Sequence, residues 1–412
     1  MAMTLDDGAE GGSSGRRAPT RRYEARRSAI VSSAVEEMNR KGVRGMTLGD
    51  VAARLDLVPT GVIYYFRNKE ELAAAAFLKG IQSYEALIDS ASGEASAEGR
   101  LSAFLAGWFD YARRVQAGEA DRLPVFNDVR ALNAPVVNEA YIGMFRRFRS
   151  LLDPALSRPH ANARAHMLLS EVFWIPAWLH QAEVADYARS ADRMARILAR
   201  GVASRDAAWP QPRPLPLAAA GEPVASEPFL RAATGLINEE GYHGASVEKI
   251  SARLNVSKGA FYHHNQTKDE LVLACFERTF EIMWRAIHAA EQAGGSGLEV
   301  LVSAVAALIE HQVSGEAPLL RTSALTAVPE ALRAGLMQRF DRLSYRFASI
   351  LCDGIADGSV APVDVNIAAQ IITAAINAAA ELHYWTPGVA PQAVVAHYVR
   401  PLFEGLCSPA AS

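Results

Sequence analysis

Two short segments of the chain place hydroxyl, phenol, imidazole and ammonium groups near the start of a short helix. The first reads LVPTGVIYYFRNKEEL over residues 57–72, and the second reads VSKGAFYHHNQTKDEL over residues 256–271. Such groups hydrogen-bond to base edges and phosphates, and a short, narrow helix with one polar side can enter the major groove of DNA. The chemistry that suits these segments is therefore recognition of a nucleic acid.

Aromatic residues at helical spacing more often fill a core than contact a partner. We assign the core role to Val62, Phe66 and Phe261. The other rings are expected to face the nucleic acid, namely Tyr64, Tyr65, Tyr262, His263 and His264.

A helix-turn-helix must position each segment, and the preceding residues carry the start and stop signals that this motif needs. Gly42 ends a first helical stripe, and Thr47, with Asp50 three residues later, caps a second short helix. Pro59 is favoured at the first position of the third helix, where its missing N–H costs nothing. In the second half, the same roles fall to Gly241, Ser246 and Ser257.

The two motifs belong to an internal repeat. Shifting the chain by 199 positions aligns residues 29–77 with residues 228–276 without a gap, and Asn39 coincides with Asn238 among other identities. Both halves show apolar residues at spacings of three and four, which predicts helices throughout and no sheet. The helices expected in the first half cover 24–40, 47–55, 59–66, 69–90, 99–117, 120–131, 134–152, 161–181 and 186–202, and the second half repeats this series.

These segments resemble the TetR family of bacterial transcriptional regulators, residues 256–271 strongly and residues 57–72 as a variant. The resemblance implies an all-α fold with two TetR-like units, each with a three-helix DNA-binding domain and a helical body for ligand binding and dimerisation. In the first unit, the implied DNA contacts are Thr47, Val58, Pro59, Thr60, Tyr64 and Tyr65. In the second unit, they are Ser246, Ser257, Lys258, Gly259, Tyr262, His263 and His264.

Several basic residues also enter the DNA-binding prediction. By resemblance, Lys69 and Lys268 contact phosphates at the start of a fourth helix, where they position the protein without reading sequence. A run of arginines lies at the start of the first unit, where Glu24 is the single acidic residue among them. The run contains Arg16, Arg17, Arg21, Arg22, Arg26 and Arg27. Such a run is either simply solvated or an arm for phosphates or the minor groove, and we include Arg21 and Arg22 among the contacts.

The family resemblance also implies a small-molecule pocket in each body and a four-helix dimerisation bundle. Candidate pocket residues in the first unit are Trp108, Phe126, Tyr141, Phe145, Trp174 and Trp178, and in the second unit Trp284, His288, His311 and Trp385. The alternative for each of them is ordinary core packing. The expected effector is a small apolar or aromatic molecule.

Proline and glycine content predicts the domain boundaries. Residues 1–20 form an expected flexible tail, and the proline-rich stretch 206–227 an expected linker. The first unit then covers residues 21–205, with its helix-turn-helix at about 21–68 and its body at about 69–205. The second unit covers residues 228–412, with its helix-turn-helix at about 228–267 and its body at about 268–407.

The remaining composition excludes several classes of protein. The net charge of −3 means that DNA binding must depend on local patches, and three distant cysteines argue against a disulfide framework or a zinc site. No nucleophile elbow, phosphate loop, HExxH or paired-carboxylate signature appears, so we expect no enzyme activity, cofactor or metal. The N-terminus lacks an apolar signal region, and we expect a cytoplasmic protein without a membrane segment.

We therefore expect a ligand-responsive, DNA-binding regulator, with repression as the expected direction. Its two units would form an intramolecular pseudo-dimer on a non-palindromic operator, and further self-association stays open. In one alternative, only the first unit reads DNA while the second serves as dimer partner and sensor. In another, the protein is a helical ligand-binding protein whose helix-turn-helix motifs no longer function.

Overall fold

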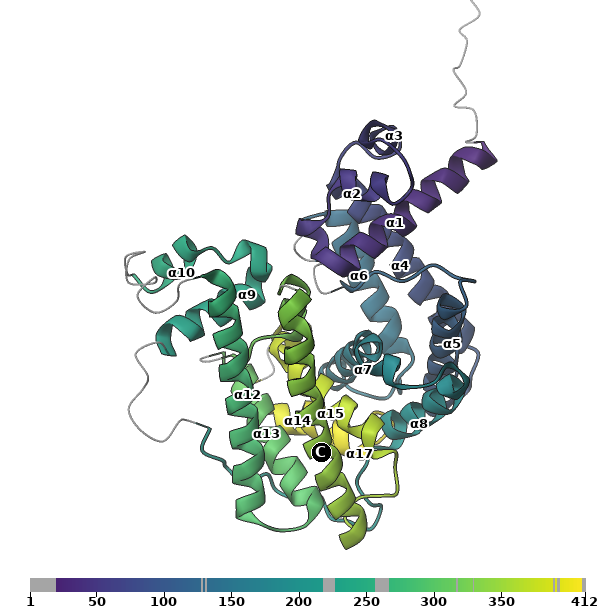
Figure 1. Ribbon diagram of the computed structural model, residues 1–412. Coiled ribbons are helices and arrows are strands. Elements are labelled where there is room, and N and C mark those ends of the chain that lie inside the picture. The colour runs from purple at the N-terminus through teal and green to yellow at the C-terminus, as the bar shows by residue number, and fades with distance from the viewer. Residues whose placement is uncertain are drawn as a thin grey trace, which may run out of the picture.

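The computed structural model describes residues 20–126, 129, 132–217, 227–255, 267–315, 318–328, 330–387, 390 and 393–409. Within these residues the fold is helical, and extended pairing is limited to an isolated bridge between Ala203 and Val360. Two helical units follow each other along the chain, each with a small N-terminal domain beside a larger body (Figure 1). The expected all-α class with two units is confirmed.

The first unit contains eight α-helices in its described residues. Its N-terminal domain consists of α1 (Arg21–Gly45), α2 (Leu48–Ala53) and α3 (Pro59–Ile63). Its body consists of α4 (Lys69–Ala91), α5 (Ala97–Gln116), α6 (Pro135–Ser150), α7 (Arg158–Trp178) and α8 (Tyr187–Arg200), with 3-10 turns η2 (Leu179–Gln181) and η3 (Val184–Asp186) between the last two. Buried rings of Phe77, Phe104, Phe109 and Phe148 fill this body.

The second unit repeats this order. Its N-terminal domain includes α9 (Glu227–Gly244) and α10 (Val247–Arg253). Its body consists of α12 (Lys268–Ala293), α13 (Gly297–Ser314), η4 (Thr322–Ala327), α14 (Glu330–Asp357), α15 (Val365–Ala378), η5 (Ala379–Glu381), α16 (Leu382–Trp385), η7 (Val395–Val399) and α17 (Arg400–Glu404). Two stretches, Gly297–Ser314 and Val365–Trp385, are long and apolar enough to cross a membrane, but 67% of each is buried in the protein, as in core helices.

The helix expected over residues 120–131 is wrong. Residues 121–125 have no regular secondary structure, and Pro124 disfavours a helical backbone at Leu123. The Nδ2 of Asn39 instead donates to the carbonyl of Leu123 at 2.9 Å, and the N–H of Val125 donates to the Oδ1 of Asn39 at 2.8 Å. Residues 121–126, called the strap below, are therefore attached to α1 by this side chain.

The second unit contains the same attachment. Asn238 donates to the carbonyl of Leu319 at 2.9 Å and accepts from the N–H of Arg321 at 3.0 Å. The identity of Asn39 and Asn238 in the repeat thus has a structural reason. Each side chain forms two hydrogen bonds with backbone groups of an irregular segment, and these groups have no partner in a helix or sheet.

The C-terminal ends of the two units make reciprocal backbone contacts. The N–H of Val202 donates to the carbonyl of Phe403 at 2.8 Å, while the N–H of Leu406 donates to the carbonyl of Leu198 at 2.7 Å. Gly201 and Gly405, both with positive φ, end the two helices at this crossing. A contact in which each partner uses the same kind of segment is typical of a two-fold relation.

Polar side chains also join the units across buried surfaces. From α7, Arg164 donates to the carbonyl of Leu406 at 2.8 Å, and the Nε2 of His166 lies 2.9 Å from the carbonyl of Ala378. Glu171, on the same helix, is 1% exposed, and burial raises the pKa of its carboxyl well above the usual value. Burial therefore favours the protonated form of this carboxyl over the ionised form.

The proline-rich linker packs on the second unit over its described part. The N–H of Arg213 donates to the Oγ of Ser303 at 3.2 Å, and its guanidinium donates to the carbonyl of Gly294 at 2.9 Å. The ring of Trp209 lies 6.3 Å from that of Phe403. These contacts hold residues 206–217 along the body, although prolines prevent a helix there.

Candidate functional site

The two N-terminal domains have the same turn geometry. Gly42 and Gly241 interrupt the first helix of each domain with φ of 73° in both cases. At the turn after the second helix, Asp56 has φ of 54° and Asn255 has φ of 55°. Asp and Asn tolerate this left-handed conformation better than most residues. The first domain thus forms a complete helix-turn-helix, and the second has the same geometry through Asn255, where its described residues end.

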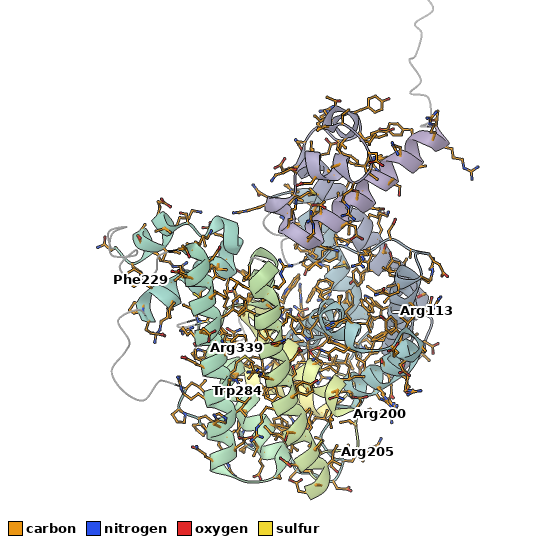
Figure 2. The ribbon with its side chains drawn as sticks, viewed as in Figure 1. Arg113, Arg200, Arg205, Phe229, Trp284 and Arg339 are labelled. Carbon is orange, nitrogen blue, oxygen red and sulfur yellow. The ribbon has the colours of Figure 1, made fainter. Side chains whose placement is uncertain are left out.

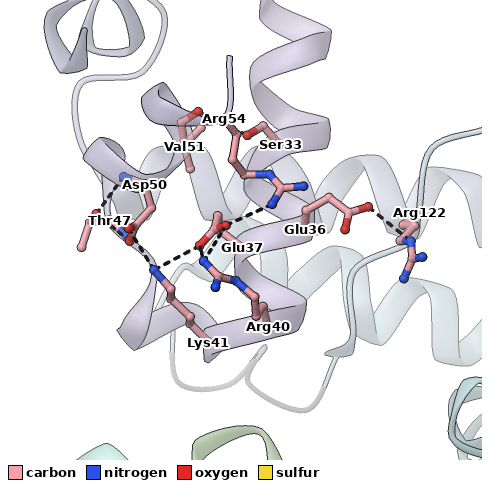
Figure 3. A network of polar contacts seen from close by, with 10 residues as sticks. All are labelled: Ser33, Glu36, Glu37, Arg40, Lys41, Thr47, Asp50, Val51, Arg54 and Arg122. Carbon is pink, nitrogen blue, oxygen red and sulfur yellow. Dashed lines mark hydrogen bonds and ion pairs between the residues drawn. The ribbon is translucent and has the colours of Figure 1, made fainter. Parts of the chain in front are cut away.

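A polar network fixes α1 against α2 in the first domain (Figure 3). The buried carboxylate of Glu37 pairs with Arg40 at 2.9 Å, Lys41 at 3.3 Å and Arg54 at 3.4 Å. Lys41 also pairs with Asp50 at 2.9 Å. Although burial disfavours the ionised form of Glu37, hydrogen bonds from Arg40 and Lys41 outweigh this effect and lower its pKa. The network therefore stays charged at neutral pH.

The second domain uses the same positions with reversed charge. Glu240 and Lys249 form an ion pair where the first domain has Lys41 and Asp50. Arg253, equivalent to Arg54, pairs with Glu239 at 2.9 Å. The charges of Glu240 and Lys249 are opposite to those of Lys41 and Asp50, so an ion pair joins the first two helices in both domains.

The outward side of α3 carries apolar and hydroxyl groups. Val58 is 66% exposed and Tyr64 is 74% exposed, and Pro59 and Thr60 are exposed beside them. The ring of Tyr65 lies 4.8 Å from that of Tyr23 on α1, which fixes its position. Val62 and Phe66 are 0% and 1% exposed, which confirms their core role. The exposed surface offers methyl, phenol and hydroxyl groups to a base edge.

The basic residues predicted to contact phosphates differ in their surroundings. Arg21 and Arg22 are exposed at the start of α1. Lys69 is half-buried, and its Nζ donates to the carbonyl of Arg44 at 2.9 Å, which leaves two of its three protons for another acceptor. Lys268 starts α12, where burial, with Arg44 nearby, lowers the pKa of its ammonium.

The remaining predicted DNA contacts are capping residues or lie outside the described chain. The hydroxyl of Thr47 accepts from the N–H of Asp50 at 3.1 Å, and that of Ser246 accepts from the N–H of Lys249 at 3.2 Å. Both therefore serve as N-caps. Outside the described residues lie Ser257, Lys258, Gly259, Phe261, Tyr262, His263 and His264, as well as Arg16 and Arg17 of the arm.

The body of the first unit contains a cavity of about 390 Å³, called the body cavity below. Trp108 and Phe126, both predicted pocket residues, line it. The Nε1 of Trp108 donates to the phenol of Tyr84 at 3.3 Å. The strap supplies Leu123 to Phe126, and Tyr111 and His180 lie at other sides. Periodicity could not identify the other strap residues of this wall, because they belong to no helix; the repeated Asn39 was the signal that could have found them.

The other predicted pocket residues lie elsewhere. Tyr141 and Trp174 line a second cavity, between the units. Phe145 stacks on Trp385 at 3.7 Å between ring centroids, and Trp178 packs against Phe109. Neither cavity is lined by these stacked residues or by Trp284, His288 and His311. Trp284 lies among the long helices of the second unit, where it stacks on His288 (Figure 2).

Comparison with known proteins matches both N-terminal domains. A family model described as bacterial regulatory proteins of the tetR family matches residues 30–76 and again residues 229–275. The transposon Tn10 TetC protein of Escherichia coli is 44% identical over 43 residues, which are 10% of this chain and 22% of that protein. The transcriptional repressor DhaR of Mycobacterium sp. (strain GP1) is 27% identical over 130 residues, 31% of this chain and 65% of that protein.

A solved structure of a tetR-family regulatory protein from Rhodococcus RHA1 is also similar. It is 24% identical, with a TM-score of 0.38, and the match covers 46% of this chain and all of that one. The chain spans less than two thirds of the length of the two curated relatives named above.

Proposed function

Because the chain belongs to the TetR family of bacterial regulatory proteins, with two TetR-like units in tandem, we propose that it is a ligand-responsive transcriptional repressor that binds DNA as an intramolecular pseudo-dimer. One observation carries this proposal: two N-terminal domains whose first two helices have matching geometry stand on one chain, and the halves of that chain make reciprocal contacts at Gly201 and Gly405. Covalent linkage gives the units a high effective concentration for each other. One chain then does what a homodimer otherwise does.

The effector is proposed to bind in the body cavity. The strap forms one of its walls, and Asn39 attaches the strap to the helix that carries the first DNA-binding domain. A ligand that moves Leu123 or Val125 by a fraction of an ångström must also move Asn39 or break its hydrogen bonds. The resulting shift of α1 changes the spacing of the two recognition helices and releases DNA. The repressor direction is supported by the relative DhaR, which is a transcriptional repressor.

The operator is proposed to be non-palindromic. Val58 and Thr60 offer methyl groups suited to thymine, whereas the second unit has Ser257 and Lys258 at the equivalent helix start, with an ammonium suited to guanine. The arginine arm precedes only the first unit and favours a narrow, A/T-rich minor groove there. We place this regulator in the cytoplasm and assign it no catalytic step.

Salt dependence of DNA binding tests the proposal. Lys69→Ala and Lys268→Ala should each weaken binding across sequences and lower the slope of log K against log salt by about one unit, because one phosphate contact is lost. Arg205→Ala is the control, since this arginine lies at the end of the molecule opposite the helix-turn-helix domains (Figure 2). Unchanged slopes in both lysine variants would remove the phosphate assignment. A lower slope for Lys69→Ala alone would leave the first unit as the only reader.

A further inference from the structure

A cavity of about 430 Å³ lies between the two units. Its walls come from the strap and α7 of the first unit and from η4, α14 and α15 of the second, and this space is called the interface cavity below. It shares Asn39, Val125, Phe126, Phe173 and Pro176 with the body cavity, so the two spaces adjoin each other. A volume of this size is sufficient for a small organic ligand.

One side of the interface cavity is flat and aromatic. The rings of Phe126 and Phe173 stack with 5.1 Å between their centroids and an angle of 12° between their planes. The ring of Tyr141 stacks on that of Phe126 with 5.7 Å between centroids. The indole N–H of Trp174 donates to Gln370 of the second unit at 3.0 Å, which fixes the orientation of this ring. Parallel, fixed rings favour a planar apolar ligand over a flexible one.

The opposite side is polar and comes from the second unit. The guanidinium of Arg321 forms an ion pair with Glu381, and the two side chains are only 17% and 19% exposed. The Nε of Arg321 is buried and has no hydrogen-bond partner among the described residues. A buried N–H of this kind costs free energy unless a ligand or water accepts its proton. Arg333 adds a second guanidinium to the lining of the cavity, to which Glu381 contributes a carboxylate.

We propose that the interface cavity binds one planar aromatic carboxylate per chain, separately from the effector in the body cavity. The ring of the ligand lies against Phe126 and Trp174, and its carboxylate accepts a hydrogen bond from the Nε of Arg321. Because the aromatic wall belongs to the first unit and the arginine to the second, the ligand binds only when the units are packed together. The site holds one ligand for two units, and its occupancy does not require that the protein bind DNA.

A matched pair of probes tests the chemistry of this site. Calorimetric titration of the full chain with 1-naphthoate should reveal a site that binds naphthalene-1-carboxamide about tenfold more weakly, because the carboxamide has nearly the same shape but lacks the negative charge that Arg321 meets. Equal affinities for the two probes would refute the proposed role of the arginine. If neither probe binds with a dissociation constant below about 1 mM, the cavity holds only water and the proposal is wrong.

Matched substitutions locate the site. Ala177 lines only the interface cavity, and Ala112 lines only the body cavity; both are helical alanines. Ala177→Phe should fill the interface cavity and weaken 1-naphthoate binding at least about tenfold, whereas Ala112→Phe should leave it unchanged. The reverse pattern would place the ligand in the body cavity and overturn the proposal.

Substitution of the arginine tests the same site independently. Arg321→Gln should remove the preference for 1-naphthoate over the carboxamide, and Arg321→Lys should restore part of it, since the positive charge returns. If Arg321→Gln binds both probes as the natural chain does, the inference is wrong. All these titrations are made without DNA, so a failure of DNA binding would appear only in a separate gel-shift measurement.

Discussion

The reciprocal contact at the ends of the two units should depend on the missing side chain of Gly201. A Cβ at this position would lie 1.9 Å from the carbonyl oxygen of Phe403, well inside any permitted contact, and Gly201 has φ of +73°. Gly201→Ala therefore combines a strained backbone with a clash against the main chain of the other unit.

The structure gives the size of the effect. Separating the two segments breaks the hydrogen bonds from Val202 and Ala203 to Phe403, from Leu406 to Leu198 and from Cys407 to Ala199, each worth about 1 kcal/mol. A non-glycine residue with this φ costs about 1 kcal/mol more. The expected loss of unfolding free energy is therefore about 5 kcal/mol.

The assay is urea unfolding followed by circular dichroism, with Gly118→Ala as the control. Gly118 is exposed and also has φ of +73°, but a Cβ there would meet nothing within 4 Å. The control should lose only the backbone contribution of about 1 kcal/mol. If both variants unfold at the same urea concentration, the contact between the units does not stabilise the fold, and the reasoning fails.

Three further predictions concern single side chains. Asn39→Ala removes both hydrogen bonds to the strap, so the N–H of Val125 should exchange with deuterium at least about tenfold faster. Asp50→Ala removes one of the two hydrogen bonds of a capping box and the ion pair with Lys41, and should lower the unfolding free energy by about 1 kcal/mol in urea titrations. Burial raises the pKa of Glu171 well above its unfolded value near 4.5, so the stability of the fold is greatest below that pH and falls as pH rises from there towards the native pKa; Glu171→Gln should flatten this fall in urea titrations at several pH values.

Helix-forming signals in the sequence were strong where they were local. The caps at Thr47 and Ser246, the stops at Gly42 and Gly241 and the start at Pro59 each depend on a few neighbouring residues, and the structure has all of them. The repeat itself could be found because both copies need the same turn. These features were sufficient to predict two helix-turn-helix domains.

Contacts between distant segments could not be predicted in the same way. The apolar residues of 120–131 suggested a helix, but Asn39, more than eighty residues earlier, holds the strap in an irregular form. Phe145 and Trp385 come from different units and stack on each other, and neither lines the body cavity or the interface cavity. Aromatic type alone does not distinguish a ring that packs on another ring from one that faces a ligand.

Selection of binding sequences from a random DNA pool by the purified chain tests the central claim most directly. If both units of one chain read DNA, the consensus will be non-palindromic, with A/T enrichment flanking only the half-site of the first unit, because only that unit has the arginine arm. A perfect inverted repeat would contradict the claim, since it would mean that two chains each contribute the same unit to the operator.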